Sequence, residues 1–370
     1  MVTLTTLYSF INKKENGDFK MYTKRINEIF KNTDCDVLFI SAQPEIFYLS
    51  GFTGDDSYLV ITKNKRYIVT DSRYFIQAAA EAVDYEMVNI AKTPVSAVLK
   101  SENVKKIGYL EKSMTCFYFN NLKSKLDGVE FEGISTIIEK VRMIKSEDEI
   151  EKIRIAAKIA DEGFSHILKF IKEGVQEIDL ALELEFFMRK KGASALSFET
   201  ICASGVRSAM PHGAASDKKI ENGDFITFDF GCVFDGYVSD MTRTVVLGKA
   251  SEKQKEIYRT VLKAQKAALS VLKAGICAKD VDKISRDIIK NAGYGENFGH
   301  GLGHSLGLLV HELPSCSPKS DVVLKENMLM TVEPGIYIEN FGGVRIEDLV
   351  VIKDGGILNL TSSEKELIEI

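Results

Sequence analysis

A segment of helical character occurs twice in the chain, and this internal repeat constrains the fold more than any other feature. FIKEGVQEIDLALELEFFMRKKGA (170–193) aligns with VLKAGICAKDVDKISRDIIKNAGY (271–294), and Gly174 falls opposite Gly275. Each copy is typical of the end of one helix, a glycine turn, and a second helix that ends at another glycine. Both copies therefore predict the same helix–turn–helix unit.

Each copy is followed by a β-rich section, which extends the repeat. ENGDFITFDFG (221–231) aligns with KENMLMTVEPG (325–335), and VSDMTR (238–243) aligns loosely with VRIEDL (344–349). We therefore expect two helix–helix–hairpin units related by a pseudo-two-fold axis.

The repeat brings four acidic residues to matching positions. Asp229 aligns with Glu333, and Asp240 aligns with Glu347. A single acid in a strand is usually a turn or edge residue, but acids that recur at matching points of two repeats are hard to attribute to chance. We expect the four carboxylates to converge about the axis.

A hairpin in the first copy gives this expectation a geometry. Asp235-Gly236 is a strong signal for a two-residue type I′ turn, which would join strands at about 225–234 and 237–246. That turn pairs Asp229 with Thr242, and side-chain alternation then places Asp229 and Asp240 on one face of the sheet, ~7–8 Å apart at the backbone. Two acids there would repel each other, and a bound cation would remove that cost.

Histidines are concentrated in the same part of the chain. Of five in all, four follow the first repeat: His212, His300, His304 and His311. His212 aligns with His311. His300 and His304 lie in NFGHGLGHSLG (297–307), whose frequent glycines argue against a regular helix or a central strand and let the backbone pass close to a ligand. The alternative is a flexible loop with incidental histidines.

Four carboxylates and one imidazole form an oxygen-rich set of candidate metal ligands. The set is Asp229, Asp240, His304, Glu333 and Glu347. Such a set suits two sites for Mn(II), or for Co(II) or Fe(II), better than it suits one closed tetrahedral site for Zn(II). Of these ions we expect Mn(II), and Zn(II) stays an alternative. Two such ions can share a water molecule, lower its pKa and polarise a carbonyl group, so the set predicts metal-assisted hydrolysis.

The part of the chain before the repeat has a different sequence pattern. Short β-rich runs at 36–40, 58–62, 66–71 and 106–111 alternate with helical stretches at 72–82 and near 93–102. This alternation predicts a small α/β domain over 21–140, after an extension at 1–20 that we expect to be disordered. Ser146 and Glu149 form a capping-box pattern that opens a long helix of the second domain, 141–370. The whole chain is expected to be α+β.

Composition excludes several classes of function. The net charge is −5 and the basic residues are scattered, so neither nucleic acid nor an anionic membrane is an expected partner. No apolar run reaches the roughly 18–20 residues of a membrane span, and the first 20 residues lack the zones of a signal peptide. Six well-separated cysteines without a CxxC pair indicate reduced thiols and a cytoplasmic protein.

Several of these motifs occur together in one known family. They are MPHG (210–213), FDFGCVFDGYVSDMTRT (228–244), FGHGLGHSLGLLVHE (298–312), VEPGIYI (332–338) and GGVRIEDLVVI (342–352). In them the chain resembles the pita-bread metallopeptidases (M24), which include aminopeptidase P, prolidase and methionine aminopeptidase. YLSGFTG (48–54), TDSRY (70–74) and VRMIKSEDEI (141–150) extend the resemblance to the first domain. The resemblance implies a creatinase/prolidase-like N-terminal domain followed by a pita-bread domain.

The resemblance also implies roles for the five candidate ligands. The residue at the position of Asp229 binds one metal, those at Asp240 and Glu347 bridge both metals, and those at His304 and Glu333 bind the other. Glu333 is in addition a candidate proton shuttle, because a carboxylate in that place can accept a proton and deliver it to the leaving nitrogen.

Five further residues are implied around the substrate. His311 would bind the scissile carbonyl group or the tetrahedral intermediate, and His212 would hold and protonate around the scissile amide. Arg345 would steady the metal ligands or the product carboxylate. His300 and Tyr337 would line the substrate site, with simple packing as the alternative for Tyr337.

The choice among relatives depends on the first domain and on the complete ligand set. Methionine aminopeptidases usually lack a first domain of this size, whereas creatinase and non-catalytic relatives lack the full set. Short proline-containing peptides are therefore the expected substrates, and the resemblance implies a homodimer. Of the remaining activities, we expect an Xaa-Pro aminopeptidase, with an Xaa-Pro dipeptidase (prolidase) as the alternative.

Overall fold

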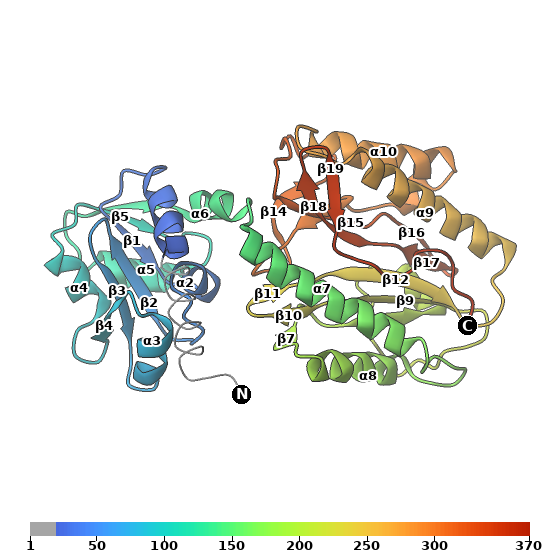
Figure 1. The fold of residues 1–370 in the computed structure, drawn as a ribbon, viewed down its shortest axis with the longest axis horizontal. Coiled ribbons are helices and arrows are strands. Elements are labelled where there is room, and N and C mark those ends of the chain that lie inside the picture. The colour runs from blue at the N-terminus through green and yellow to red at the C-terminus, as the bar shows by residue number, and fades with distance from the viewer. Residues whose placement is uncertain (1–19) are drawn as a thin grey trace, which may run out of the picture. The chain divides into compact units, whose positions relative to one another are not determined.

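The computed structural model describes residues 20–370. The expected extension at 1–20 therefore lies, apart from Lys20, outside the described residues. Among the described residues, 20–30 are helical. The chain divides into an N-terminal unit that ends at Val141 and a C-terminal unit, Arg142–Ile370 (Figure 1). Within the described residues, no helix combines the length and the apolar character needed to cross a membrane.

The N-terminal unit is built on one mixed sheet with the strand order β4-β3-β2-β1-β5-β6. Its strands are β1 (Val37–Ile40), β2 (Tyr58–Thr62), β3 (Arg66–Thr70), β4 (Glu86–Asn89), β5 (Lys106–Tyr109) and β6 (Glu130–Gly133). Its helices are α2 (Gln43–Ser50), α3 (Phe75–Glu81), α4 (Val95–Ser101), α5 (Cys116–Lys123) and α6 (Ser135–Arg142), which crosses the boundary between the units. Pairing is parallel for β3/β4, β1/β5 and β5/β6, and antiparallel for β1/β2 and β2/β3.

The four strands predicted in this unit are confirmed, and two were missed. β4 and β6 are edge strands whose sequences, EMVN and EFEG, are mostly exposed or half-buried. An edge strand without a continuous apolar run carries little sequence signal. The central strands, in contrast, bury residues such as Val37, Phe39 and Val60 completely.

The C-terminal unit contains the repeat. Its helices are α7 (Glu147–Ile167), α8 (Glu177–Lys190), α9 (Glu252–Val271) and α10 (Ala278–Asn291). α8 and α10 have 14 residues each and occupy equivalent positions of the two aligned segments. The glycines before them, Gly174 and Gly275, have φ of 84° and 89°, which confirms the expected glycine turns. The predicted capping box of Ser146 and Glu149 opens α7.

The strands of this unit form small antiparallel sheets. In the first copy they are β7 (Ala195–Leu196), β8 (Ile201–Ser204), β9 (Phe225–Phe230), β10 (Cys232–Phe234), β11 (Tyr237–Val238) and β12 (Met241–Val246). In the second copy they are β13 (Gly303–Ser305), β14 (Glu312–Cys316), β15 (Leu329–Val332), β16 (Gly335–Ile338), β17 (Gly342–Arg345), β18 (Asp348–Lys353) and β19 (Gly356–Asn359). Two 3₁₀ turns complete the unit, η1 (Gly205–Ala209) and η2 (Gly295–Asn297).

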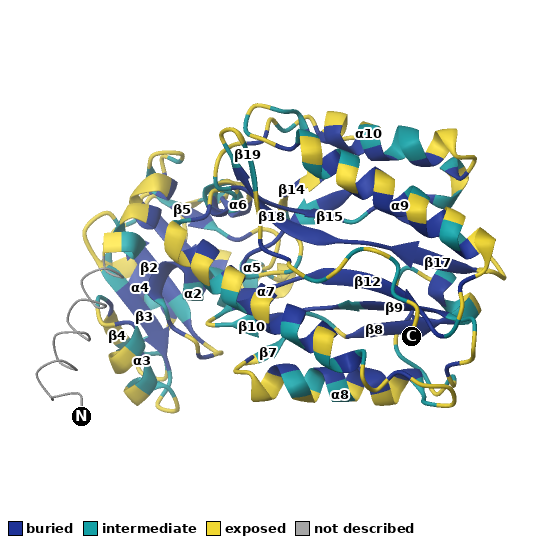
Figure 2. Ribbon diagram, turned by 45° about the vertical axis from the view of Figure 1, so that its right-hand side comes forward, coloured by how far each residue is buried: buried dark blue, intermediate teal, exposed yellow. Residues whose placement is uncertain are grey.

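The helices pack in pairs on the outer side of these sheets. α7 packs with α8 and α9 with α10, and each pair contributes to its own apolar core. Figure 2 shows β12, β15 and β17 buried along their length, whereas α8, α9 and α10 alternate between buried and exposed residues. β9 is buried except at Asp229. The sheets therefore form a rigid centre from which polar side chains can be positioned accurately.

The first hairpin confirms the predicted turn and register but not the predicted strand lengths. Asp235 and Gly236 both have positive φ, 47° and 82°, and Asp229 pairs with Thr242. The strand that we expected to be continuous is broken at Gly231, where the backbone of Ser239 comes very close. A Cβ at Gly231 would lie 1.9 Å from the carbonyl oxygen of Ser239. This close approach of two backbones divides the hairpin between two sheets.

Candidate metal centre and active site

Three carboxylates from different strands converge in the C-terminal unit. Asp229 lies in β9, Asp240 immediately precedes β12, and Glu347 immediately precedes β18. One oxygen of each lies within 4.8 Å of an oxygen of the other two. Asp240 and Glu347 are 5% and 1% exposed and Asp229 is half-buried, so most of the group is shielded from solvent.

His304 and Glu333 lie beside this group. The Nε2 atom of His304 is 3.7 Å from Oδ2 of Asp240 and 3.3 Å from Oε1 of Glu333. Its Nδ1 atom lies 3.1 Å from the carbonyl oxygen of Ser305, so a proton on Nδ1 leaves the Nε2 lone pair facing the carboxylates. Burial lowers the pKa of His304, which favours the neutral imidazole that binds metals.

The carboxylates lack the partners that buried carboxylates need. Six buried side-chain polar atoms in residues 20–370 have no hydrogen-bond partner, and three of them are Oδ1 of Asp229, Oδ1 of Asp240 and Oε1 of Glu347. Leaving one such oxygen unpaired in a protein interior costs several kcal/mol when it is charged. Three in one place indicate that a cation belongs there.

The pKa values of these groups point the same way. Burial, followed by the charges of Glu347 and Asp229, raises the pKa of Asp240 well above its usual range. Burial and then Glu333 raise the pKa of Glu347, and burial raises the pKa of Glu333 to about 7. Divalent cations would reverse these shifts by stabilising the ionised carboxylates, and the oxygen-rich donor set suits them.

Two threonines that the sequence did not single out hold the carboxylates in place. Thr242 donates a hydrogen bond of 2.8 Å to Oε2 of Glu347, and Thr331 donates one of 3.0 Å to Oε1 of Glu333. Thr331 also accepts a hydrogen bond from the backbone N–H of His304 at 3.0 Å. Strand alternation could have found Thr331, because it lies two residues before Glu333 and shares its face.

Arg345, Tyr337 and His300 form a hydrogen-bonded chain at one side of the group. Arg345 donates to Oδ2 of Asp229 at 2.6 Å and to the hydroxyl of Tyr337 at 2.9 Å. That hydroxyl lies 3.0 Å from Nε2 of His300. Burial lowers the pKa of His300 to about 4, so its imidazole is neutral. Arg345 is thus hydrogen-bonded to one of the candidate metal ligands, and its role in the site stays a prediction.

The predicted residues surround one cavity of about 740 Å³, which lies entirely within the C-terminal unit. Its polar walls are Asp229, Asp240, Glu333, His212, His300, His304, His311, Tyr337 and Arg345. Phe198, Ile201 and Val310 contribute apolar surface, and the rings of His304 and His311 are 4.5 Å apart. The structure therefore places nine of the ten predicted site residues on the wall of a pocket of ligand size, with Glu347 buried in the carboxylate group.

The Gly-rich segment around His304 contains neither a regular helix nor a central strand, as the glycines predicted. His304 lies in β13, a strand of three residues that pairs only with β14. The register shifts between His304 and Ser305. A Cβ at Gly303 would lie 2.0 Å from the carbonyl oxygen of Thr331, so glycine allows two backbone segments to come close together here. The expected approach of the backbone to a ligand stays a prediction.

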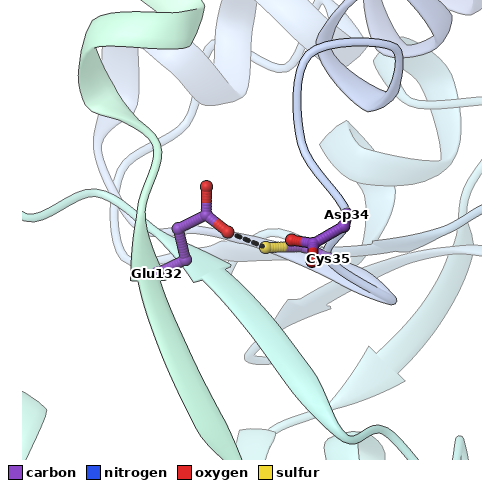
Figure 3. A group of neighbouring side chains, drawn as sticks. All are labelled: Asp34, Cys35 and Glu132. Atoms are coloured by element: carbon purple, nitrogen blue, oxygen red, sulfur yellow. Dashed lines mark hydrogen bonds between the residues drawn. The ribbon is translucent and has the colours of Figure 1, made fainter.

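A second group of potential ligands lies in the N-terminal unit: Asp34, Cys35 and Glu132 (Figure 3). Lys106 already neutralises it, because its ammonium group is hydrogen-bonded to Asp34 and lies 2.7 Å from Oε2 of Glu132. Burial raises the pKa of the Cys35 thiol to about 11, so the thiol stays protonated. We assign no metal site to this group.

Comparison with known proteins identifies the family. Residues 151–354 match the model described as metallopeptidase family M24, and residues 23–144 match the creatinase/prolidase N-terminal domain. The chain belongs to metallopeptidase family M24. The predicted family and the predicted two-domain α+β fold are thereby confirmed, and membership of M24 identifies a hydrolase that uses divalent metal ions.

Relatives of this M24 peptidase match it over nearly the whole chain. The Xaa-Pro dipeptidase of Pyrococcus horikoshii is 41% identical over 347 residues, 93% of this chain and 98% of the relative. The structure of an Xaa-Pro dipeptidase from Bacillus anthracis has a TM-score of 0.91 at 43% identity, covering 94% of this chain and 99% of that one. An X-Pro aminopeptidase from Thermotoga maritima has a TM-score of 0.88 at 40% identity, with the same coverage of 94% and 99%.

Proposed function

We propose that this M24 peptidase is an Xaa-Pro dipeptidase with two divalent ions at Asp229, Asp240, His304, Glu333 and Glu347. The observation that carries the proposal is the convergence of three unpaired, buried carboxylate oxygens beside His304, at a cavity of ligand size. Such a set is incomplete without cations, and the family to which the chain belongs uses them.

The names of the relatives support one of the two exopeptidase activities more than the other. From the sequence we expected an Xaa-Pro aminopeptidase, with the dipeptidase as the alternative. The relatives from Pyrococcus horikoshii and Bacillus anthracis, at 41% and 43% identity, are both named Xaa-Pro dipeptidase, and we now favour that activity. The X-Pro aminopeptidase of Thermotoga maritima, at 40% identity, keeps the aminopeptidase as the second candidate.

The protein's own side chains would handle protons and substrate. When bound, the ions would polarise the scissile carbonyl group and lower the pKa of the attacking water. Glu333, whose Oε1 is held by Thr331, would accept a proton from that water and pass it to the leaving nitrogen. Burial lowers the pKa of His311, so a neutral imidazole on the cavity wall can hydrogen-bond to the substrate, with His212 on the same wall.

Three further parts of the proposal rest on the sequence alone. They are manganese as the physiological ion, a cytoplasmic location and a homodimer. Inductively coupled plasma mass spectrometry on protein purified from its own cells would identify the ion. Sedimentation analysis would give the number of chains.

Three short peptides test the activity. Manganese-loaded protein would be assayed with Ala-Pro, with Ala-Pro-amide, which lacks only the free carboxylate, and with Arg-Pro-Pro. A dipeptidase gives the highest kcat/KM for Ala-Pro. A higher value for Arg-Pro-Pro would establish the aminopeptidase instead. Cleavage of none of the three by protein that demonstrably holds metal would refute both.

A further inference from the structure

A buried group of charged side chains lies behind the cavity and has no place in the chemistry proposed above. Arg142 and Lys145 come from the motif VRMIKSEDEI (141–150), and both reach Glu312, the residue after His311. Their side chains are 5% and 1% exposed, and that of Glu312 is 7% exposed. Buried ion pairs are costly to desolvate and add little net stability, so this cluster calls for another explanation.

Glu312 organises the backbone of the loop that precedes it. Its Oε1 accepts hydrogen bonds from the backbone N–H groups of Leu308 at 2.8 Å and Leu309 at 3.1 Å, and also from Arg142. A Cβ at Gly307 would lie 2.8 Å from Oε2 of Glu312, so the loop folds directly around the carboxylate. The segment 307–311 is thus shaped by Glu312, and it ends at His311.

Lys145 connects the same carboxylate to the other side of the loop. Its Nζ lies 3.3 Å from Oε2 of Glu312 and donates a hydrogen bond of 3.1 Å to the hydroxyl of Ser305. The backbone carbonyl of Ser305 faces Nδ1 of His304 at 3.1 Å, which orients the imidazole toward the carboxylates. One cluster therefore anchors the loop at the residue next to each of the two histidines.

We propose that Arg142, Lys145 and Glu312 form a positioning cluster that sets the orientations of His304 and His311 on the cavity wall. The chemical roles of the two imidazoles are taken from the proposed function, on which the proposal rests in this respect. How the imidazoles are held in place does not depend on that function. Neither basic residue touches the cavity, so each would act only through the loop.

Lys145→Met is the most informative substitution. It removes both hydrogen bonds of the ammonium group, keeps an apolar stem of similar length, and leaves Arg142 to neutralise Glu312. Burial already lowers the pKa of Lys145, against the opposing charges of Glu312 and Glu149, so an apolar side chain suits the site. Lys218→Met is the control, because Lys218 also forms an ion pair, with Asp224 at 2.6 Å, has a side chain that is 23% exposed, and does not line the cavity.

Two readouts separate positioning from general stabilisation. They are the visible absorption spectrum of the Co(II)-loaded protein, which reports ligand geometry, and kcat and KM for Ala-Pro, all at a temperature where every variant is folded. We expect Lys145→Met to shift the spectrum and lower kcat about 10–100-fold, with a much smaller change in KM. Lys218→Met should match the wild type. A wild-type spectrum and kcat in Lys145→Met, whatever its Tm, would overturn the proposal.

A milder variant keeps the proposal testable if Lys145→Met does not fold. Ser305→Ala removes only the hydroxyl that receives the ammonium group, and we expect a smaller spectral shift in the same direction. An unchanged spectrum there would count against the cluster. If the wild type cleaves no Xaa-Pro peptide, the proposed function fails, whereas the cobalt spectra still decide whether the cluster orients His304.

Discussion

Each of the two units contains a cluster of acidic side chains, and the two clusters differ in what surrounds them. In the N-terminal unit, Asp34 and Glu132 (Figure 3) have side chains that are 78% and 31% exposed. The ammonium group of Lys106 forms an ion pair with each of them. In the C-terminal unit, Asp229, Asp240 and Glu347 are shielded from solvent, and one oxygen of each has no partner. A missing partner, and not the number of acids, therefore distinguishes a cation site from a salt-bridged surface cluster.

The largest effect is expected where one residue serves both ions. Asp240→Asn keeps the shape of the side chain but removes the charge at the centre of the carboxylate group. Metal catalysis supplies several kcal/mol, so we expect kcat/KM for Xaa-Pro peptides to fall at least ~10³-fold, together with the loss of bound metal. Activity assays and metal analysis of the same sample measure both. Asp34→Asn is the control, and a similar loss in that variant would erase the distinction between the two groups.

Removing the metal should destabilise the C-terminal unit. An ion that binds only the folded protein stabilises it by about 2.7 kcal/mol at 100 times its Kd. We therefore expect the free energy of unfolding in urea to drop by roughly that amount when a chelator replaces saturating Mn(II). In Asp240→Asn the chelator should make little difference. If the chelator lowered the free energy of unfolding equally in the wild type and in the variant, the stabilising ion would have to bind elsewhere.

Metal-free protein should respond to pH in the opposite way from an ordinary salt bridge. Because the folded pKa of Glu333 is raised to about 7 from its usual 4.5, the folded chain holds a proton over this range that the unfolded chain has released. Stability should then rise as the pH falls from about 7 to about 4.5. The pKa of Asp34 is instead lowered, mainly by Lys106, so its contribution is lost only as the pH falls below 3.8.

Chemical unfolding at pH 5, 6, 7 and 8 with a chelator present measures this response. Glu333→Gln, which cannot titrate, should make the rise smaller, and the raised pKa values of Asp240 and Glu347 should account for what remains. Saturating Mn(II) should also remove it, because bound cations keep the carboxylates ionised. A metal-free wild type whose stability falls steadily from pH 7 to pH 5 would show that the buried carboxylates are not held at raised pKa values.

The smallest effect is expected in the N-terminal unit. Lys106→Met removes the cation from a cluster that solvent already screens, so we expect a slight change in Tm and none in kcat/KM. Differential scanning calorimetry and the Ala-Pro assay measure the two quantities. If Lys106→Met acquired a tightly bound metal ion, exposure would be a poor guide to which acidic groups bind cations.

Features with a short-range signal could be predicted from the sequence. The repeat gave the positions of α8 and α10, Asp235-Gly236 gave the hairpin register, and alternation placed Asp229 with Asp240. Each of these depends on local periodicity or on two residues at a turn. Aligning the two copies then extended local signals to carboxylates more than 100 positions apart.

Contacts without a periodic signal could not be predicted. Lys145 and Glu312 are separated by 167 positions, and no pattern in either segment links them. The break at Gly231 depends on how close the backbone of Ser239 comes, which is known only once both strands are placed. In both cases the determining quantity is a distance between segments that the repeat does not relate.

Anomalous diffraction from crystals grown with Mn(II), recorded above and below the manganese edge, tests the metal centre most directly. We expect two peaks enclosed by the five residues Asp229, Asp240, His304, Glu333 and Glu347, and none between Asp34, Cys35 and Glu132. Peaks in the N-terminal group, or a carboxylate group without manganese in the C-terminal unit, would refute the assignment.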